Sequence, residues 1–290
     1  MMIWGLFIGI VILIGLLFAR RRHKRDLGRK SLEARLRALT QLRLLRLLLE
    51  QVQRHRGLCF GVLCGDQTLE GERWLVHAEV SRLIGDAKKL RANLLGHEAW
   101  QRVFPLWQRI DQERQDGEAI GLLNLHNELA ELILGTIEAL ADRHDLVCLG
   151  WLAPQPEGLW LALLQNAEVL GQARAAGTGI AARRQDDAVQ QQVLKRLADL
   201  IRQQFYLAPA QLSVDPALRA SLARPVREAE DSIDALLQSI DLLLKDPLHP
   251  ALGSMAFFKR ATQAISAHYM LADLLLERLR LATEAAIKQD

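Results

Sequence analysis

Residues 45–63 read LRLLLEQVQRHRGLCFGVL, and this stretch contains the pattern that decides the fold. Apolar side chains recur every three or four positions, which is the period of an α-helix with one buried face. This face consists of Leu45, Leu48, Leu49, Val52, Cys59, Phe60 and Leu63. Arg56 falls on the same face, with apolar neighbours before and after it. The stretch therefore predicts a long helix that carries an arginine among its buried residues.

The helical period continues through the rest of the chain, and no stretch alternates as a β-strand would. Leu and Ala dominate the apolar residues and only 5% of residues are aromatic, which also favours helix. We expect eight helices, over about residues 31–64, 68–95, 98–114, 118–143, 157–184, 187–207, 215–245 and 254–287. Long helices with short connections pack antiparallel. The predicted fold class is therefore all-α, with two four-helix bundles divided near residues 154–158.

Some helix boundaries can be predicted from single residues. Asp186 or Asp187 should cap the helix that ends near Leu207, and Ser254 should cap the last helix. Pro225 lies inside a predicted helix and should kink or split it, because proline lacks the backbone N–H that the helix needs.

The N-terminus has the pattern of a membrane anchor. Residues 3–19, IWGLFIGIVILIGLLFA, carry no charge, and at helical rise they span about 26 Å, near the lower limit for a membrane helix. Seven Lys or Arg and one Asp follow in residues 20–30. A cleaved signal peptide carries its positive charge before the apolar run. We therefore expect a transmembrane anchor at residues 1–19, a basic juxtamembrane segment at 20–30 and a helical domain at 31–290.

The charge distribution indicates where the domain lies and which partners it excludes. The positive-inside rule places the N-terminus outside and residues 31–290 in the cytoplasm, at the inner membrane of a bacterium. Residues 31–290 carry a formal charge of −3, although the whole chain carries +3. A nucleic-acid-binding domain would be basic, so we expect no nucleic-acid partner. Cys59, Cys64 and Cys148 lack the spacing of a disulfide framework, which fits a reducing compartment.

The sequence contains no recognisable catalytic motif. His55 and Cys59 lie at i and i+4, but no third group that would orient such a pair is evident. Glu128 and Glu131 lack the Glu-x-x-His partner of a di-metal bundle site. We therefore expect no enzyme activity, no cofactor and no metal site. An enzyme alternative would need a site in the segments that contain Trp100, Trp107, Trp151 and Trp160, which are better explained as packing residues.

Arg56 and Arg174 are the candidate binding residues. Arg174 interrupts an apolar face formed by Leu163, Ala167, Leu170 and Ala181. A buried guanidinium costs several kcal/mol unless a negative group meets it. One alternative is an internal ion pair with Glu128, Glu131 or Glu168. The other is that both arginines converge on a small anion, because the guanidinium fork suits a planar oxyanion, and that the anion draws two helices together.

At these residues the chain resembles the nitrate- and nitrite-sensing (NIT) domain family. Residues 47–58, LLLEQVQRHRGL, are similar to the opening motif of the family, with His55 in place of the usual Glu. Residues 167–177, AEVLGQARAAG, are similar to its second motif, Leu-Gly-x-x-Arg-x-x-Gly. Residues 257–265, FFKRATQAI, followed by Tyr269 and Asp273, resemble its closing helix. The resemblance covers roughly residues 40–285.

The resemblance implies a two-bundle helical sensor that holds nitrate or nitrite between the bundles through Arg56 and Arg174. No output module follows the last sensor-like helix, so we expect the signal to pass to a separate signalling protein. Gly5 and Gly9 have the spacing that allows two membrane helices to pack, so a homodimer is one arrangement. The alternative is a membrane-tethered helical scaffold or interaction protein that has lost ligand binding, which the change at His55 favours.

Overall fold

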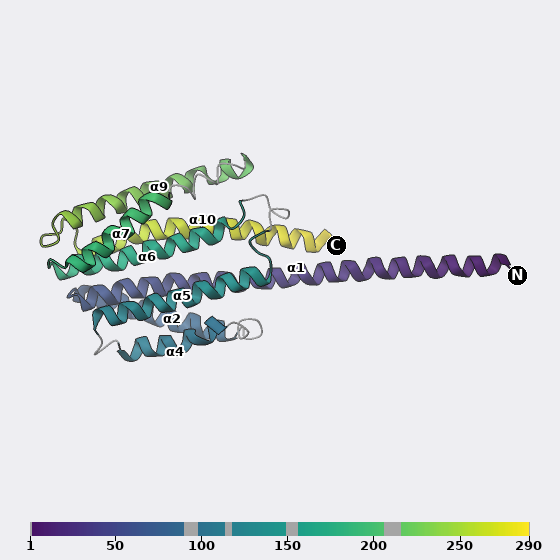
Figure 1. Cartoon of the computed structure of the whole chain (residues 1–290), viewed down its shortest axis with the longest axis horizontal. Helices are drawn as coiled ribbons and strands as arrows, with labels where there is room; N and C mark the ends of the chain where they lie inside the picture. Colours follow the sequence, from purple (N-terminus) through teal and green to yellow (C-terminus); the bar gives the residue numbers. More distant parts are fainter. Residues whose placement is uncertain (1, 90–97, 114–117, 149–155, 206–215, 290) are drawn as a thin grey trace.

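The computed structural model describes residues 2–89, 98–113, 118–148, 156–205 and 216–289, with the side chains of 2–27, 204, 217 and 218 outside the description. Within these ranges the chain is all-helical and contains no β-strand, which confirms the all-α part of the predicted fold class (Figure 1). The helices are α1 (Met2–Leu63), the 3₁₀ helix η1 (Gln67–Leu69), α2 (Glu70–Lys89), α4 (Glu98–Glu113), α5 (Ala119–Arg143), α6 (Leu159–Arg183), α7 (Ala188–Gln204), α9 (Pro216–Lys245) and α10 (Ser254–Gln289).

Helix α1 is the longest element and the one around which the others assemble. It contacts α2, α5, α6 and α10, because its apolar residues are buried on more than one side. Leu45, Leu48, Leu49 and Val52, all from the stretch that predicted the helix, have no exposed surface. The predicted core face of residues 45–63 is thus confirmed, except that Leu63, at the end of the helix, is 36% exposed.

The N-terminal part of α1 continues without a break through residues 2–30 and extends beyond the other helices (Figure 1). The side chains of the predicted anchor, residues 1–19, lie outside the described part of the chain. Among the side chains that the structure describes, no helix is both long and apolar enough to cross a membrane.

The remaining helices pair on two sides of a seam formed by α1, α6 and α10. On one side α2 and α5 pack on α1, and α4 packs on α5; on the other side α7 packs on α6, and α9 packs on α10. Figure 1 shows the two sets one above the other, with α1 and α5 facing α6 and α10. Glycines of α6 allow this helix to pack closely against both α10 and α1. A Cβ at Gly177 of α6 would lie 2.1 Å from the ring of Phe257 of α10, and one at Gly179 would lie 2.2 Å from the ring of Phe60 of α1.

The two helix caps predicted from the sequence have different outcomes in the structure. The Asp187 carboxylate accepts a hydrogen bond from the backbone N–H of Gln190, which confirms the predicted cap of α7. Ser254 is the first residue of α10 rather than its cap, and its hydroxyl donates to the carboxylate of Asp66 instead. The prediction for Ser254 was therefore wrong, because a distant carboxylate competes for the hydroxyl.

Pro225 does not split its helix, since α9 runs continuously from Pro216 to Lys245. A proline removes only one backbone donor, and the packed apolar residues farther along α9, Ala229, Ile233, Leu236 and Ile240, are fully buried.

Three of the tryptophans considered for an enzyme site, Trp100, Trp107 and Trp160, are buried in the core. Trp151 lies outside the described residues, as do the predicted helix ends near residues 95, 114 and 207.

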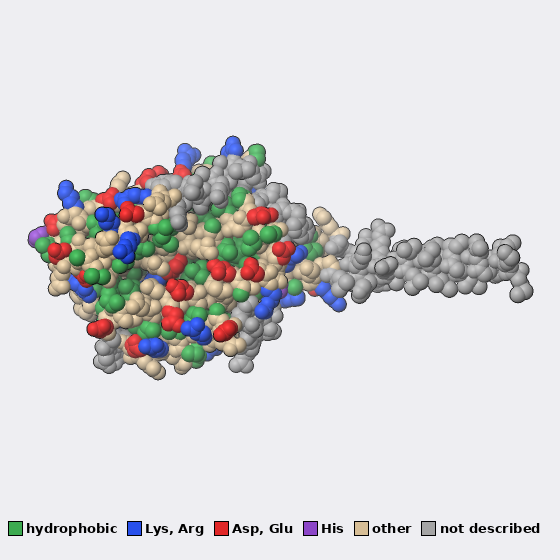
Figure 2. Space-filling model, viewed as in Figure 1, with side chains coloured by type: hydrophobic (Ala, Val, Ile, Leu, Met, Phe, Trp, Pro, Cys, Tyr) green, Lys and Arg blue, Asp and Glu red, His purple; other side chains and the backbone are tan. Residues whose placement is uncertain are grey.

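The surface of the helical body carries both charge signs. On the face in Figure 2, Lys and Arg side chains are interspersed with Asp and Glu side chains. Many of them form ion pairs within one helix, such as Arg82 with Glu79 and Asp86. Such exposed pairs contribute little to stability.

Candidate functional site

The two predicted arginines lie on facing helices of the seam, Arg56 on α1 and Arg174 on α6. Both are buried, with 0% and 2% of their surface exposed. Their burial follows from their positions on the apolar faces of two helices that pack against each other. Each guanidinium lies against a glycine of the opposite helix. A Cβ at Gly171 would lie 2.7 Å from Nη2 of Arg56, and a Cβ at Gly57 would lie 3.5 Å from Nε of Arg174.

Arg56 is paired with Glu168 of α6, one of the three acids that the sequence offered. Nη1 donates to Oε1 at 2.6 Å and Nη2 to Oε2 at 3.3 Å. Nη1 also donates to Oδ1 of Asn127 on α5 at 2.8 Å. Of the other two acids, Glu128 pairs with Arg102 near the surface, and Glu131 is exposed. For Arg56 the ion-pair alternative therefore describes the contacts.

The carboxylate of Glu168 is held by more than the arginine. Gln53 donates to Oε2 at 2.8 Å and Gln172 donates to Oε1 at 2.9 Å. Gln53 in turn accepts a hydrogen bond from the Tyr269 hydroxyl of α10 at 2.9 Å. Burial raises the pKa of Tyr269 well above its usual value, so the hydroxyl remains a donor. This network connects α1, α6 and α10 through buried polar groups that satisfy one another.

Arg174 is in a different environment, because no described carboxylate forms an ion pair with it. Nη1 donates to the Thr262 hydroxyl at 2.9 Å. The guanidinium lies over the ring of Phe258, 4.8 Å from its centroid. Nε and Nη2 have no hydrogen-bond partner among the described residues. Burial, followed by the nearby charge of Arg56, lowers the pKa of Arg174 to about 9, which indicates that the charged form is poorly stabilised.

The two unpartnered nitrogens of Arg174 form one edge of the guanidinium, from which two parallel N–H groups point the same way. Other arginines of this chain use the same edge to bind a carboxylate with two hydrogen bonds. These pairs are Arg46 with Asp273, Arg73 with Glu70, Arg82 with Glu79 and Arg280 with Glu277. Arg174 thus presents, in a buried seam, the donor pair that planar oxyanions accept.

A second buried polar cluster begins at His55, the residue before Arg56, and the sequence pattern indicated only its His55 and Cys59 members. His55 and Cys59 of α1 meet His126 of α5, and all three are buried. Nδ1 of His55 lies 2.8 Å from Nε2 of His126. The ring of Trp107 of α4 packs 5.0 Å from that of His55, centroid to centroid. His126 could have been noticed as the polar residue on the apolar face formed by Leu122, Leu125 and Leu129.

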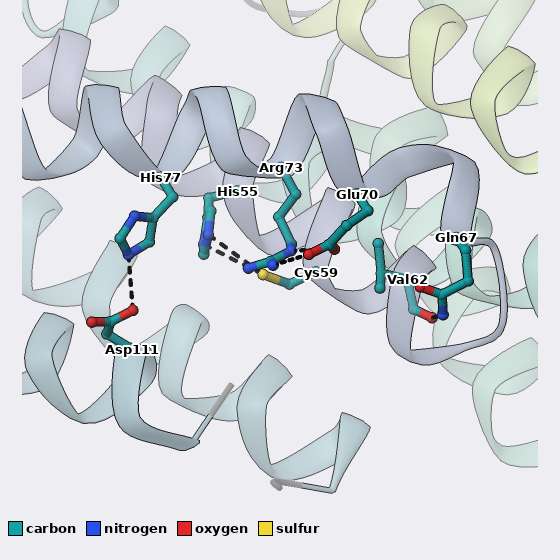
Figure 3. Close-up of polar contacts among 8 residues, drawn as sticks. All are labelled: His55, Cys59, Val62, Gln67, Glu70, Arg73, His77 and Asp111. Atoms are coloured by element: carbon teal, nitrogen blue, oxygen red, sulfur yellow. Dashed lines mark hydrogen bonds and ion pairs between the residues drawn. The ribbon is translucent and has the colours of Figure 1, made fainter. Parts of the chain in front are cut away.

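Charged residues of α2 border this cluster. Figure 3 shows the Arg73 guanidinium beside Cys59, with Glu70 bound to its far side, and shows His77 directed toward Asp111 of α4. Nε of Arg73 donates to Glu70 at 2.7 Å. Burial is the largest single influence on the pKa of Arg73 and lowers it. The hydrogen bond and charge of Glu70 and the contact with Cys59 together outweigh burial, so the pKa of Arg73 is raised.

Comparison with known proteins adds no relative: no protein-family model matches the chain, and no curated sequence or solved structure is significantly similar to it.

Proposed function

We propose that the chain is a sensor of nitrate or nitrite in which Arg174 provides the main hydrogen bonds to the anion and Arg56 lies beside it. The observation that carries the proposal is the free Nε/Nη2 edge of Arg174, buried and without a carboxylate among the described residues. The resemblance of residues 47–58, 167–177 and 257–273 to the NIT family supports the same ligand class.

The charge balance of the seam favours a monovalent anion. Glu168 neutralises Arg56, and the neighbouring Arg46 and Arg54 pair with Glu50 and Glu72. Arg174 therefore remains as a buried positive charge. One negative charge would restore neutrality, whereas a divalent anion would leave an excess negative charge in a place that solvates it poorly. Nitrate and nitrite carry one charge and offer two oxygens at the spacing of the guanidinium edge.

The close packing around Arg174 suggests how binding would be transmitted. Gly57 of α1 and Phe258 of α10 lie next to the guanidinium. An anion at the Nε edge therefore has to displace these neighbours, so that it favours one arrangement of α1, α6 and α10 over another. A ligand shifts such an equilibrium by the difference between its affinities for the two arrangements. We propose that the seam separates two four-helix bundles, α1/α2/α4/α5 and α6/α7/α9/α10, and that the anion changes how they pack.

The output and location of the sensor are parts of the same proposal. We propose that residues 1–19 anchor the chain in the inner membrane of a bacterium and that the helical domain lies in the cytoplasm, because a basic segment follows the apolar run. A change in the seam would then be read by a separate signalling protein, or by a second copy of this chain through the anchor. The proposal includes no nucleic acid and no enzyme activity.

The test is the thermal stability of the full chain in detergent with added nitrate or nitrite. A ligand present at 100 times its Kd stabilises the folded state by about 2.7 kcal/mol, which for a domain of this size raises the Tm by roughly 5–10 °C. Chloride and sulfate at equal ionic strength are the controls for general salt effects. Absence of stabilisation by millimolar nitrate and nitrite, in a sample with a cooperative transition, contradicts the proposal.

The second candidate is a membrane-tethered helical scaffold without a ligand. The observation that favours it is that Glu168 and Asn127 accept hydrogen bonds from both Nη1 and Nη2 of Arg56. A scaffold gives no anion response, and crosslinking to a partner from the host membrane would then be independent of nitrate. A sensor gives crosslinking that changes with the anion.

A further inference from the structure

The cluster of His55, Cys59 and His126 combines three metal-ligand side chains in a small volume. His55 and Cys59 are one helical turn apart on α1, and α5 brings His126 to the same face. One ligand atom from each residue can be chosen so that all three lie within 4.8 Å of one another. The side chains have 0%, 3% and 0% exposure, so they are already separated from water. Two imidazoles and one thiol form a donor set that soft metal ions prefer.

The distances from His55 to Cys59 and to His126 are close to those that a bound ion requires. Metal bonds of about 2.0 Å to nitrogen and 2.3 Å to sulfur place sulfur and nitrogen about 3.6 Å apart around one ion. The Cys59 sulfur lies 3.5 Å from Nδ1 and 3.6 Å from Nε2 of His55. The two histidine nitrogens, at 2.8 Å, have to separate by roughly 0.6 Å to share the ion.

The hydrogen bonds of His126 already orient it as a ligand. Nδ1 lies 2.7 Å from the carbonyl oxygen of Leu122 and donates to it, which leaves Nε2 with a lone pair directed at His55. Metal-bound histidines commonly hold their second nitrogen in this way. Burial, with a further effect of the nearby Arg56, lowers the pKa of His126 to about 4, so the ring is neutral at physiological pH.

Access and charge also fit. A pocket of about 190 Å³ is lined by Cys59, Glu70, Arg73 and Leu122 and opens beside the sulfur. Arg73 contacts the sulfur, and Glu70 balances the charge of Arg73 (Figure 3). The Arg73–Glu70 and Arg56–Glu168 pairs are each neutral. A monovalent ion on the thiolate therefore keeps the cluster neutral, whereas a divalent ion leaves one buried positive charge.

We propose that His55, Cys59 and His126 form a binding site for a single soft monovalent metal ion, Cu⁺, with three-coordinate geometry. Binding forms bonds from the ion to the Cys59 sulfur, to Nε2 of His126 and to Nδ1 of His55. The Cys59 thiol releases its proton to solvent through the pocket. The proton on Nδ1 of His55, which lies between the two rings, moves to Nε2 of His55. The copper does not change its oxidation state.

The test is an anaerobic titration of the full chain in detergent with Cu⁺ buffered by a chromophoric chelator. The expected result is one Cu⁺ per chain, with X-ray absorption showing one sulfur and two nitrogen neighbours. Cys59→Ser and His126→Gln should each weaken binding at least about 100-fold, since each removes a direct ligand. Cys64→Ser, five positions along the same helix and also buried, and Cys148→Ser, at an exposed cysteine, should bind as the parent chain does.

Each of several outcomes would overturn the proposal. They are retention of binding in Cys59→Ser, loss of binding in Cys64→Ser or Cys148→Ser, and tighter binding of Zn²⁺ than of Cu⁺ at the same residues. Circular dichroism of every variant without metal establishes that it is folded. Cys59→Ser changes a single atom, so it provides the decisive comparison if His126→Gln does not fold.

Discussion

Gly171 of α6 lies directly against the Arg56 guanidinium of α1, so that a Cβ at Gly171 would come within 2.7 Å of Nη2. The contact explains the small residue at this point of the helix. A methyl group there would push the guanidinium away from the carboxylate of Glu168, whose Oε2 lies 3.3 Å from Nη2. The geometry of the pair therefore depends on the absence of a side chain on the opposite helix.

Gly171→Ala should destabilise the fold by about 1–3 kcal/mol, because it overpacks a buried contact and strains an ion pair. The measurement is the free energy of unfolding from chemical denaturation followed by circular dichroism. Gly135→Ala is the matched control, since α5 is also a helix and nothing lies within 4 Å of a Cβ at Gly135. There the alanine should stabilise by about 0.5–1 kcal/mol. Equal effects of the two substitutions would contradict the contact.

Arg56→Met should destabilise by about 3–5 kcal/mol, because it leaves the Glu168 carboxylate buried without its cation. The double variant Arg56→Met/Glu168→Leu should be more stable than Arg56→Met alone, since both charges are then removed. A double-mutant cycle on the unfolding free energies measures the coupling. A coupling energy near zero would show that the pair does not hold the seam together.

The sequence predicted the positions of both arginines correctly because burial of a helical residue follows from its own face. Arg56 and Arg174 interrupt apolar faces, and they are buried in the structure. The partner of Arg56 could only be narrowed to three acids. Glu168 is 112 positions away, and its selection depends on how α1 and α6 are rotated against each other.

The His126 contact shows the same limit more clearly. His55 and His126 are 71 positions apart, and no local pattern connects them. Ser254 gives the opposite error, because the local rule predicted a cap and a residue 188 positions away takes the hydroxyl instead. Sequence patterns thus determined the helices and their buried faces, whereas the side-chain contacts required the packing of helices that are distant in sequence.

His126 should make the protein less stable in acid. The ring is fully buried and its pKa is lowered to about 4 from 6.5. Between these pH values the unfolded chain binds a proton that the folded chain does not, so stability is complete above about pH 6.5 and falls as the pH falls toward 4. The loss should reach about 3 kcal/mol for this group. His268, whose pKa is also lowered by burial, adds to it in the same direction.

The measurement is the unfolding free energy between pH 7.5 and 4 for the parent chain, His126→Gln and His249→Gln. His126→Gln should flatten the dependence, because it removes the group that titrates differently in the two states. The His249 side chain is 84% exposed, so its replacement should leave the dependence unchanged. A parent chain of constant stability from pH 7 to pH 4.5 would contradict the argument.

Arg174→Met should not destabilise the fold in a buffer without nitrate and should stabilise it by about 1 kcal/mol, because it removes a buried charge that no described carboxylate neutralises. Arg46→Met is the matched control. Both guanidiniums lie 4.8 Å from an aromatic centroid, but Arg46 is bound by Asp273 and Glu50. Its replacement should lower the free energy of unfolding by about 1–3 kcal/mol.

Thermal melts with and without nitrate then separate the roles of the two arginines: Arg46→Met keeps the stabilisation by the anion and Arg174→Met loses it. If the two variants were destabilised equally and Arg174→Met still responded to nitrate, the free edge of Arg174 would not be the binding site.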